Sequence, residues 1–144
     1  MSEALVVDAS VAIKWYLPEI HAEVALACLD DKYHLLVPDL FFSEFGNILW
    51  KKCRVGEITH NEANTIFDAL AKVPLQNYPL EKLLLPSFEL AVGMDRTVYD
   101  CIYLALAVSE ACKMLTADRK FYDVVAGSPY SGNILWVEEV KSEG

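Results

Sequence analysis

Four acidic residues stand at positions where a purely structural carboxylate would be unfavourable. They are Asp8, Glu44, Asp100 and Asp118. Asp8 and Asp118 each end an apolar run, and the other two lie close to or on the apolar stripe of a predicted helix. A carboxylate buried without a partner costs roughly several kcal/mol. No Lys or Arg occupies a matching set of inward positions, so we expect a bound cation as the partner and predict a metal-dependent enzyme.

The ligand chemistry of these acids favours a hard cation. Oxygen ligands without His or Cys suit Mg²⁺ or Mn²⁺, which keep several waters and bind phosphate oxygens of a substrate. Two such ions, about 4 Å apart, can activate a water and stabilise both oxygens of an in-line phosphoryl displacement. Ser10 and Thr116 flank two of the acids and offer hydroxyls that could support the ligands.

Each acid also has an ordinary structural explanation. Asp8 could cap the helix that follows it. Asp100 could be a first-turn carboxylate that accepts hydrogen bonds from backbone N–H groups. Glu44 stands at the edge of an apolar arc, where a solvated residue would give the same pattern. The joint occurrence of the four, and no single one of them, favours a functional site.

Short apolar segments alternate with helical patterns along the chain. We expect strands at residues 5–8, 34–37, 75–78, 114–116 and 134–137. We expect a short helix that Pro18 ends and further helices at 20–31, 39–54, 59–72, 80–94 and 97–112. Thr59 and Glu62 fit a capping box, and Asp39 is placed to cap the helix after it. The alternation predicts an α/β fold, with a parallel sheet covered by helices on both faces.

This architecture would bring the acids together. In open parallel sheets, sites form beyond the carboxyl ends of the strands, where the strand order reverses. If the strands before Asp8 and Asp118 are neighbours, both side chains emerge at the same edge of the sheet. Asp100 shares a helix face with Leu104, Ala107 and other apolar residues, so we expect it to point inward, near the helix N-terminus.

Length and composition set the remaining limits. The 144 residues predict one domain, residues 1–144, with an acidic tail from about residue 138. The hydrophobic fraction of 54% suggests strands buried on both faces or a surface that binds a partner. No apolar stretch approaches the roughly 18 residues that span a bilayer, and the start carries no basic leader, so we expect a cytoplasmic protein without a membrane segment.

Cysteine usage bears on the cellular compartment, and net charge bears on the substrate. The cysteines fall in helical patterns without a CxxC pair, so we expect buried free thiols in a reducing cytosol; they are Cys28, Cys53, Cys101 and Cys112. The net charge of −9 weakens a nucleic-acid interpretation, because such substrates favour basic proteins. It does not exclude one, since bound divalent ions would neutralise part of the acidity locally.

Together, these residues resemble the motifs of a known family. The sequence is similar to PIN domains, and among them to the small VapC-type toxins of prokaryotic toxin–antitoxin pairs. The resemblance covers essentially the whole chain and rests on four segments in order: Val7-Asp8-Ala9-Ser10, Phe42-Ser43-Glu44-Phe45, the run 99–105 around Asp100, and Leu115-Thr116-Ala117-Asp118.

The resemblance implies a three-layer α/β/α fold and a Mg²⁺- or Mn²⁺-dependent endoribonuclease. Asp8, Glu44, Asp100 and Asp118 would be the catalytic metal ligands, with Ser10 and Thr116 as polar helpers. It also implies a homodimer and a cognate antitoxin whose C-terminal segment covers the acidic groove. Many relatives carry a further acid where this chain has Lys120, and Asp123 is the nearest replacement. With fewer acids, we expect one tightly held ion and a second that arrives with RNA.

Basic residues near the acids would contact RNA phosphates. We expect Arg119 and Lys120, which follow Asp118, and Lys14, one short helix after Asp8. The run 51–54 also carries cations, although cations at a helix C-terminus need no ligand. Exposed aromatic residues could form a groove for an antitoxin helix or a dimer contact, or could be core; the candidates are Trp15, Tyr16, Phe41, Phe42 and Trp50. The rival interpretation of the whole chain is a non-catalytic PIN-like module that binds protein or RNA.

Overall fold

The computed structural model describes residues 3–140 of the chain. Its strands form one five-stranded parallel sheet in the order β3-β2-β1-β4-β5. Val7 is in register with Leu115, so the segments that follow β1 and β4 leave the sheet side by side. The strands are β1 (Glu3–Val7), β2 (Tyr33–Pro38), β3 (Leu75–Tyr78), β4 (Lys113–Thr116) and β5 (Ile134–Trp136).

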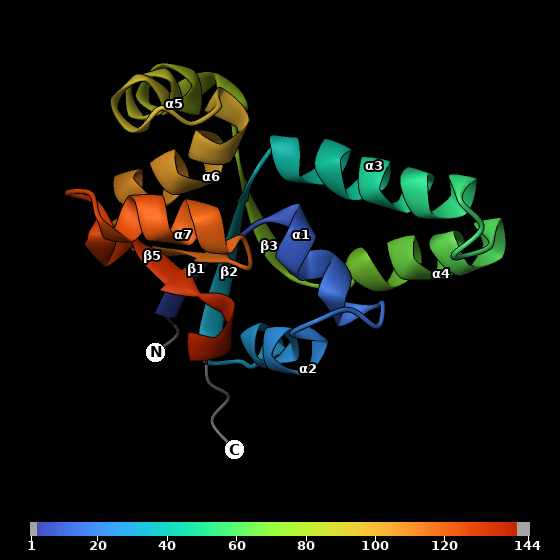
Figure 1. Ribbon diagram of the computed structural model, residues 1–144. Helices are drawn as coiled ribbons and strands as arrows, with labels where there is room; N and C mark the ends of the chain where they lie inside the picture. The colour runs from blue at the N-terminus through green and yellow to red at the C-terminus, as the bar shows by residue number, and fades with distance from the viewer. Residues whose placement is uncertain (1–2, 141–144) are drawn as a thin grey trace.

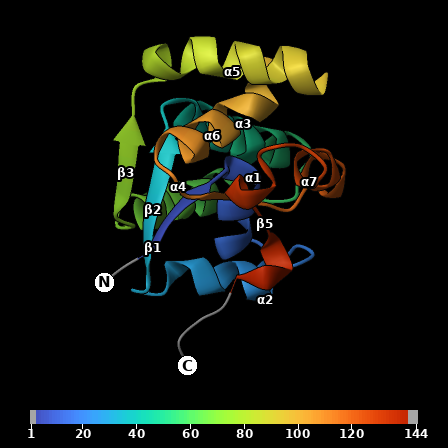
Figure 2. The same cartoon turned by 90° about the vertical axis from the view of Figure 1, so that its left-hand side faces the viewer.

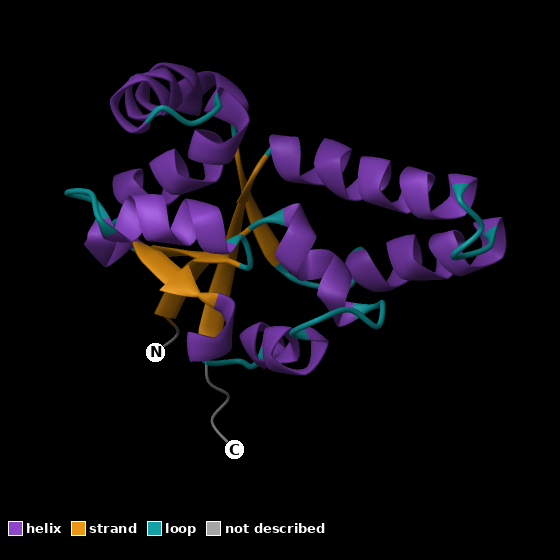
Figure 3. Cartoon of the chain, viewed as in Figure 1, coloured by secondary structure: helices purple, strands orange, loops and turns teal. Residues whose placement is uncertain are grey.

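Helices make every connection between these strands (Figure 3). Before β3 they are α1 (Ala9–Ala12), η1 (Ile13–Trp15), α2 (Ala22–Ala25), η2 (Leu26–Leu29), α3 (Leu40–Arg54) and α4 (His60–Leu70). After β3 they are α5 (Leu80–Met94), α6 (Val98–Ser109), α7 (Arg119–Ala126), η3 (Ser131–Asn133) and η4 (Val137–Glu139). Within residues 3–140, no helix has both the length and the apolar character that crossing a membrane requires.

The chain starts in the middle of the sheet and extends it in two directions. It forms β2 and β3 on one side of β1, then crosses back to form β4 and β5 on the other. Because parallel crossovers are right-handed, this reversal places α1 to α4 on one face and α5 to α7 on the other. Figures 1 and 2 show α5 and α6 above the sheet and α2 below it. The predicted α/β/α fold with a parallel sheet is confirmed, and its strand order reverses between β1 and β4.

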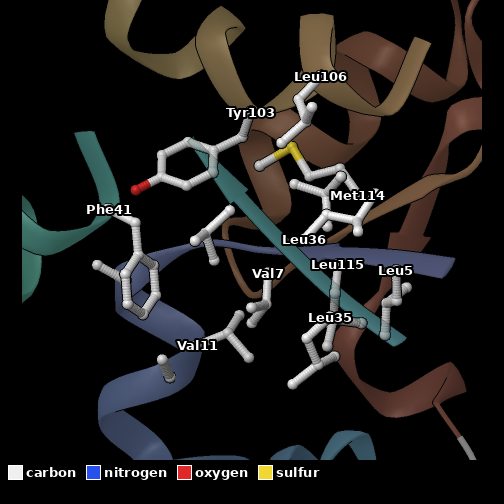
Figure 4. Close-up of a cluster of buried hydrophobic side chains, with 14 of the residues drawn as sticks. Leu5, Val7, Val11, Leu35, Leu36, Phe41, Tyr103, Leu106, Met114 and Leu115 are labelled. Atoms are coloured by element: carbon white, nitrogen blue, oxygen red, sulfur yellow. The ribbon is translucent and has the colours of Figure 1, made fainter. Parts of the chain in front are cut away.

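The core lies where the central strands meet α3 and α6. Strand side chains such as Leu5, Val7 and Leu115 are fully buried, and α6 is buried continuously from Cys101 to Ala107. Figure 4 shows these leucines and valines packed together with residues of both helices. The ring of Tyr103 belongs to this cluster, but its hydroxyl oxygen points away from the apolar side chains (Figure 4).

Several local expectations need correction. The predicted helix 20–31 is divided into α2 and η2, and it starts only after His21, whose left-handed backbone (φ 66) interrupts any earlier helix. Asp39 occupies the N-cap position of α3, but its carboxylate makes no capping hydrogen bond to that helix. It accepts the N–H of Leu80 at 3.1 Å instead. Helix α7 was not expected.

The cysteine and tail predictions are also only partly right. Cys28 and Cys101 are buried, whereas Cys53 and Cys112 are half-buried, and Cys112 lies in the turn between α6 and β4. The acidic residues at 138 and 139 are ordered in η4, where both carboxylates accept hydrogen bonds from Trp136. The remainder of the predicted tail, from residue 141, lies outside the described residues.

Candidate active site

A cavity of about 310 Å³ opens at the carboxyl ends of β1 and β4, where the strand order reverses. Four separate segments contribute an acid to its wall: Asp8 follows β1, Glu44 lies on α3, Asp100 lies in the first turn of α6, and Asp118 precedes α7. Ser10 and Thr116 line the same cavity. The structure therefore brings together all four predicted acids and both predicted hydroxyls.

Asp8 has both of the roles considered for it from the sequence. Its Oδ1 caps α1 by accepting the N–H of Val11 at 2.9 Å, and it also accepts the hydroxyl of Ser10 at 2.8 Å. Burial, with a smaller contribution from the charges of Glu44 and Asp118, raises the pKa of Asp8 from 3.8 to about 6, in spite of the two hydrogen bonds, which lower it. A carboxylate with this pKa is held in a site that disfavours its own charge.

Asp118 is held in the same way at the neighbouring strand. Its Oδ1 accepts the N–H of Phe121 at 3.1 Å and so caps α7. Its own N–H donates to Oγ1 of Thr116 at 3.1 Å, and the Thr116 side chain is 1% exposed. Thr116 therefore fixes the turn that carries Asp118 out of the sheet.

Glu44 is positioned by Tyr103, a residue of the run 99–105 for which the sequence predicted no role. The hydroxyl of Tyr103 donates to Oε1 of Glu44, across from α6 to α3. Tyr103 is 3% exposed, and burial followed by its bond to Glu44 raises the pKa of its phenol, so the hydroxyl stays a donor. The signal was present in the sequence, because Tyr103 lies one helical turn after Asp100 and so faces the same side of α6.

The expectation that no Lys or Arg is placed to pair with the acids is wrong. Arg96, in the connection between α5 and α6, places Nη2 3.3 Å from Oδ2 of Asp100 and 3.7 Å from Oδ2 of Asp118. No helical or strand periodicity assigns a direction to a residue in such a connection, which is why its orientation was missed. Two of the four acids thus share one guanidinium.

The basic residues predicted to contact substrate do not line the cavity. Lys14 is buried and pairs with Glu19 at 3.2 Å, Arg119 pairs with Asp123 at 3.2 Å on the outer surface of α7, and Lys120 is exposed. The cationic side chain in the cavity wall is Lys51, from the cluster at the end of α3. Lys51 forms no ion pair with any residue in the range 3–140.

Comparison with known proteins identifies the fold family. The sequence model of the PIN domain family matches residues 5–127, a region that includes all four acids. This chain belongs to the PIN domain family. Two similar relatives of this PIN domain come from Pyrobaculum aerophilum. Ribonuclease VapC3 is 36% identical over 81% of this chain and 90% of the relative, and exonuclease VapC9 is 31% identical over 78% of this chain and 87% of the relative.

Solved structures agree with that assignment. PAE2754 from Pyrobaculum aerophilum superposes on this PIN domain with a TM-score of 0.65 at 27% identity, over 95% of this chain and 85% of that one. A chain from a toxin–antitoxin complex of Klebsiella pneumoniae gives a TM-score of 0.61 over 91% of this chain and 95% of that one. At 17% identity this second likeness concerns the fold alone. The predicted membership among VapC-type PIN domains is confirmed.

The donor chemistry of this PIN domain fits a hard divalent cation, but the side chains are not gathered around one point. Carboxylates and hydroxyls line the cavity without His or Cys, as Mg²⁺ and Mn²⁺ prefer. Among residues 3–140, no three acidic, imidazole or thiol groups are close enough to hold one ion. Tyr103 holds Glu44 and Arg96 holds Asp100 and Asp118, so closing the site requires a shift of these side chains.

Proposed function

We propose that this PIN domain is a divalent-metal-dependent endoribonuclease and the toxin of a type II toxin–antitoxin pair. The observation that carries the proposal is the convergence of four carboxylates, from four separate segments, on one cavity at the point where strand order reverses. A carboxylate with a raised pKa in a cavity, as Asp8 is, is typical of functional sites. The similar relatives are named as a ribonuclease and an exonuclease, which supports hydrolysis of phosphodiester bonds.

Each side chain of the site would have a definite part in this chemistry. Asp8, Glu44, Asp100 and Asp118 would hold Mg²⁺ or Mn²⁺, which supplies an activated water and neutralises charge on the phosphate. The Ser10 hydroxyl and the N–H of Val11 keep Oδ1 of Asp8 in place, which leaves Oδ2 for an ion. Hydroxyl partners of this kind orient metal ligands, and their loss commonly lowers metal affinity or activity by about 10–100-fold.

RNA would approach along α3 and the start of α6. Asn47 and Lys51 lie one and two turns after Glu44 on the same face of α3, and both line the cavity. We therefore propose Lys51 as a phosphate contact, in place of the buried Lys14. Tyr99 lines the opposite wall and is 65% exposed, which allows a base to stack on its ring. Arg119 and Lys120 stay predicted contacts outside the cavity.

The experiment that tests the proposal compares Asp8→Asn with the wild-type protein on RNA. We expect cleavage with Mn²⁺, none with EDTA, and a loss of at least about 100-fold in Asp8→Asn, since the side chain would no longer bind the ion as an anion. Asp68→Asn, an exposed carboxylate on α4, is the matched control and should cleave normally. Cleavage that survives in both EDTA and Asp8→Asn would contradict the proposal.

One observation favours the rival function of a non-catalytic binding module. Arg96 already neutralises part of the charge on Asp100 and Asp118, so the fold tolerates these acids without an ion. In that case the protein would bind RNA or a protein partner but would not cleave RNA under any metal condition. If folded protein binds RNA without cleaving it, the protein is a binding module and not a nuclease.

The proposed partners are a cognate antitoxin and a second copy of the chain. Of the aromatic residues singled out from the sequence, Trp15 and Phe41 are core, Tyr16 is half-buried, and Phe42 and Trp50 are exposed on α3. Exposed aromatics next to an acidic cavity suit an antitoxin segment that combines apolar and basic residues. Helix α5 also exposes a row of apolar side chains, which supports a dimer contact; they are Leu84, Leu85, Phe88 and Val92.

A further inference from the structure

Arg96 is fixed by the ends of the two helices that it connects. Helix α5 ends at Met94 and is capped by Asp95, which has a left-handed backbone (φ 54); the N–H of Arg96 then donates to the carbonyl of Ala91 at 3.2 Å. Helix α6 begins immediately afterwards, because the Thr97 hydroxyl accepts the N–H of Asp100 at 3.1 Å. The backbone on both sides of Arg96 is therefore held, and its guanidinium reaches toward the junction of β4 and α7.

At that junction the guanidinium lies among three groups that attract a cation. Its Nη2 is 3.3 Å from Oδ2 of Asp100 and 3.7 Å from Oδ2 of Asp118. Its central carbon is 5.5 Å from the centre of the Phe121 ring, which is buried and lines the cavity. Carboxylates and an aromatic face together form a favourable environment for one positive charge. Arg96 thus pairs with two of the acids that a metal ion would need.

The surroundings of Arg96 leave one of its hydrogen-bond donors without a partner among the described residues. The Nε of Arg96 is buried and has no hydrogen-bond acceptor within residues 3–140. An unpaired buried donor loses its hydration without compensation, and the loss is larger for a charged group. The guanidinium is therefore held by the charges of Asp100 and Asp118, and no complementary set of acceptors holds it. A group that neutralised these charges would remove most of what keeps Arg96 in place.

We propose that Arg96 is a resident counter-ion that competes with the divalent cation for Asp100 and Asp118. In the metal-free protein it neutralises the two acids, and on metal binding it leaves them and turns toward solvent. The inference rests on the metal site of the proposed function and adds a residue that sets its affinity. It accounts for the absence of a three-carboxylate cluster among the described residues, since Arg96 draws two of the four acids to itself.

Removing this competitor should make the cation bind more tightly. The ion must first break the pairing of Arg96 with both acids, and a cost of about 1.4 kcal/mol for this step corresponds to about a tenfold change in affinity. We therefore expect Arg96→Gln to bind Mn²⁺ about tenfold more tightly than the wild-type protein in calorimetric titrations after EDTA treatment. Arg96→Lys keeps the charge and should stay close to the wild type. The matched control is Arg54→Gln, which loses the same charge at a guanidinium stacked 5.2 Å from the Trp50 ring.

A second measurement follows Arg96 itself. In metal-free protein the buried Nε–H should give a resolved ¹H–¹⁵N signal, which Arg96→Lys identifies by its absence. Titration with Mg²⁺ should shift this signal and speed its exchange with water as the side chain is released.

Each of three outcomes would contradict one part of the proposal. Equal or weaker Mn²⁺ binding by Arg96→Gln would overturn the competition, because the guanidinium would then be indifferent to the ion or would order its ligands. An Nε–H signal that does not respond to Mg²⁺, in protein that binds the ion, would overturn the release of the side chain. Failure of the wild type and of every variant to bind Mn²⁺ would overturn the metal site of the proposed function itself.

Discussion

The charge of Asp8 opposes folding of the metal-free protein, so we expect Asp8→Asn to stabilise it. Burial, together with the charges of Glu44 and Asp118, raises the pKa of Asp8 from 3.8 to about 6. Asparagine has the same shape, keeps an oxygen that can accept the bonds from Ser10 and Val11, and is as good an N-cap as aspartate. The substitution therefore removes the charge and leaves the local structure in place.

The size and sign of the effect follow from this pKa. A rise from 3.8 to about 6 corresponds to about 3 kcal/mol. Because the pKa is higher in the folded state, the unfolded chain binds fewer protons between these values, and stability falls as the pH rises from about 4 to about 6. The penalty is absent below this window and complete above it. Allowing for partial exposure of the carboxylate, we expect Asp8→Asn to be more stable by about 1–3 kcal/mol at pH 7.5.

Urea unfolding in EDTA measures this difference directly. The advantage of Asp8→Asn at pH 7.5 should fall by about half at pH 5, since part of the wild-type Asp8 is then protonated. Asp68→Asn removes an exposed carboxylate from α4 and should stay within about 0.5 kcal/mol of the wild type at both values. An Asp8→Asn protein that is no more stable than the wild type at pH 7.5, or whose advantage does not depend on pH, would refute the reasoning.

Two further substitutions test the supports of the site. Tyr103→Phe removes the hydroxyl that donates to Glu44. We expect urea unfolding to show a free energy of unfolding lower by about 1–3 kcal/mol, since hydrogen bonds to charged groups contribute that much. An unchanged free energy of unfolding would show that this hydrogen bond makes no net contribution. Asp100→Asn breaks only a half-exposed ion pair with Arg96, so stability should change by less than about 1 kcal/mol while Mn²⁺ affinity falls in calorimetric titration. A large loss of stability would instead mean that Asp100 serves the helix.

Much of the fold could be predicted because its elements have strong local patterns. The strand at 34–37 contains the apolar run Leu35-Leu36-Val37 between helices. The Thr59 capping box is present as expected, with Glu62 accepting the Thr59 N–H at 2.9 Å. Helix α7 was missed although Phe121 and Val125, four residues apart, form the buried face of an amphipathic eight-residue helix.

The parts of the candidate site that lie at strand ends could be predicted from the sequence. The parts that depend on the direction of a side chain could not. Asp8 and Asp118 were expected together because parallel strands end at one edge of the sheet, and β1 does pair with β4. Lys14 was expected near them, but η1 turns it inward toward Glu19. Arg96 was missed because a residue between two helices has no face that periodicity can assign. Such contacts depend on tertiary packing that one sequence does not display.

The two strand-end carboxylates each commit one oxygen to a helix and keep one for the cavity. Oδ1 of Asp8 and Oδ1 of Asp118 hold the first turns of α1 and α7, which leaves only Oδ2 of each for an ion. Calcium binds carboxylates through one or both oxygens, whereas magnesium takes single oxygens in a near-ideal octahedron. In the proposed metal site, the capping of α1 and α7 would limit Asp8 and Asp118 to one oxygen each. That arrangement would suit magnesium better than calcium held by both oxygens of a carboxylate.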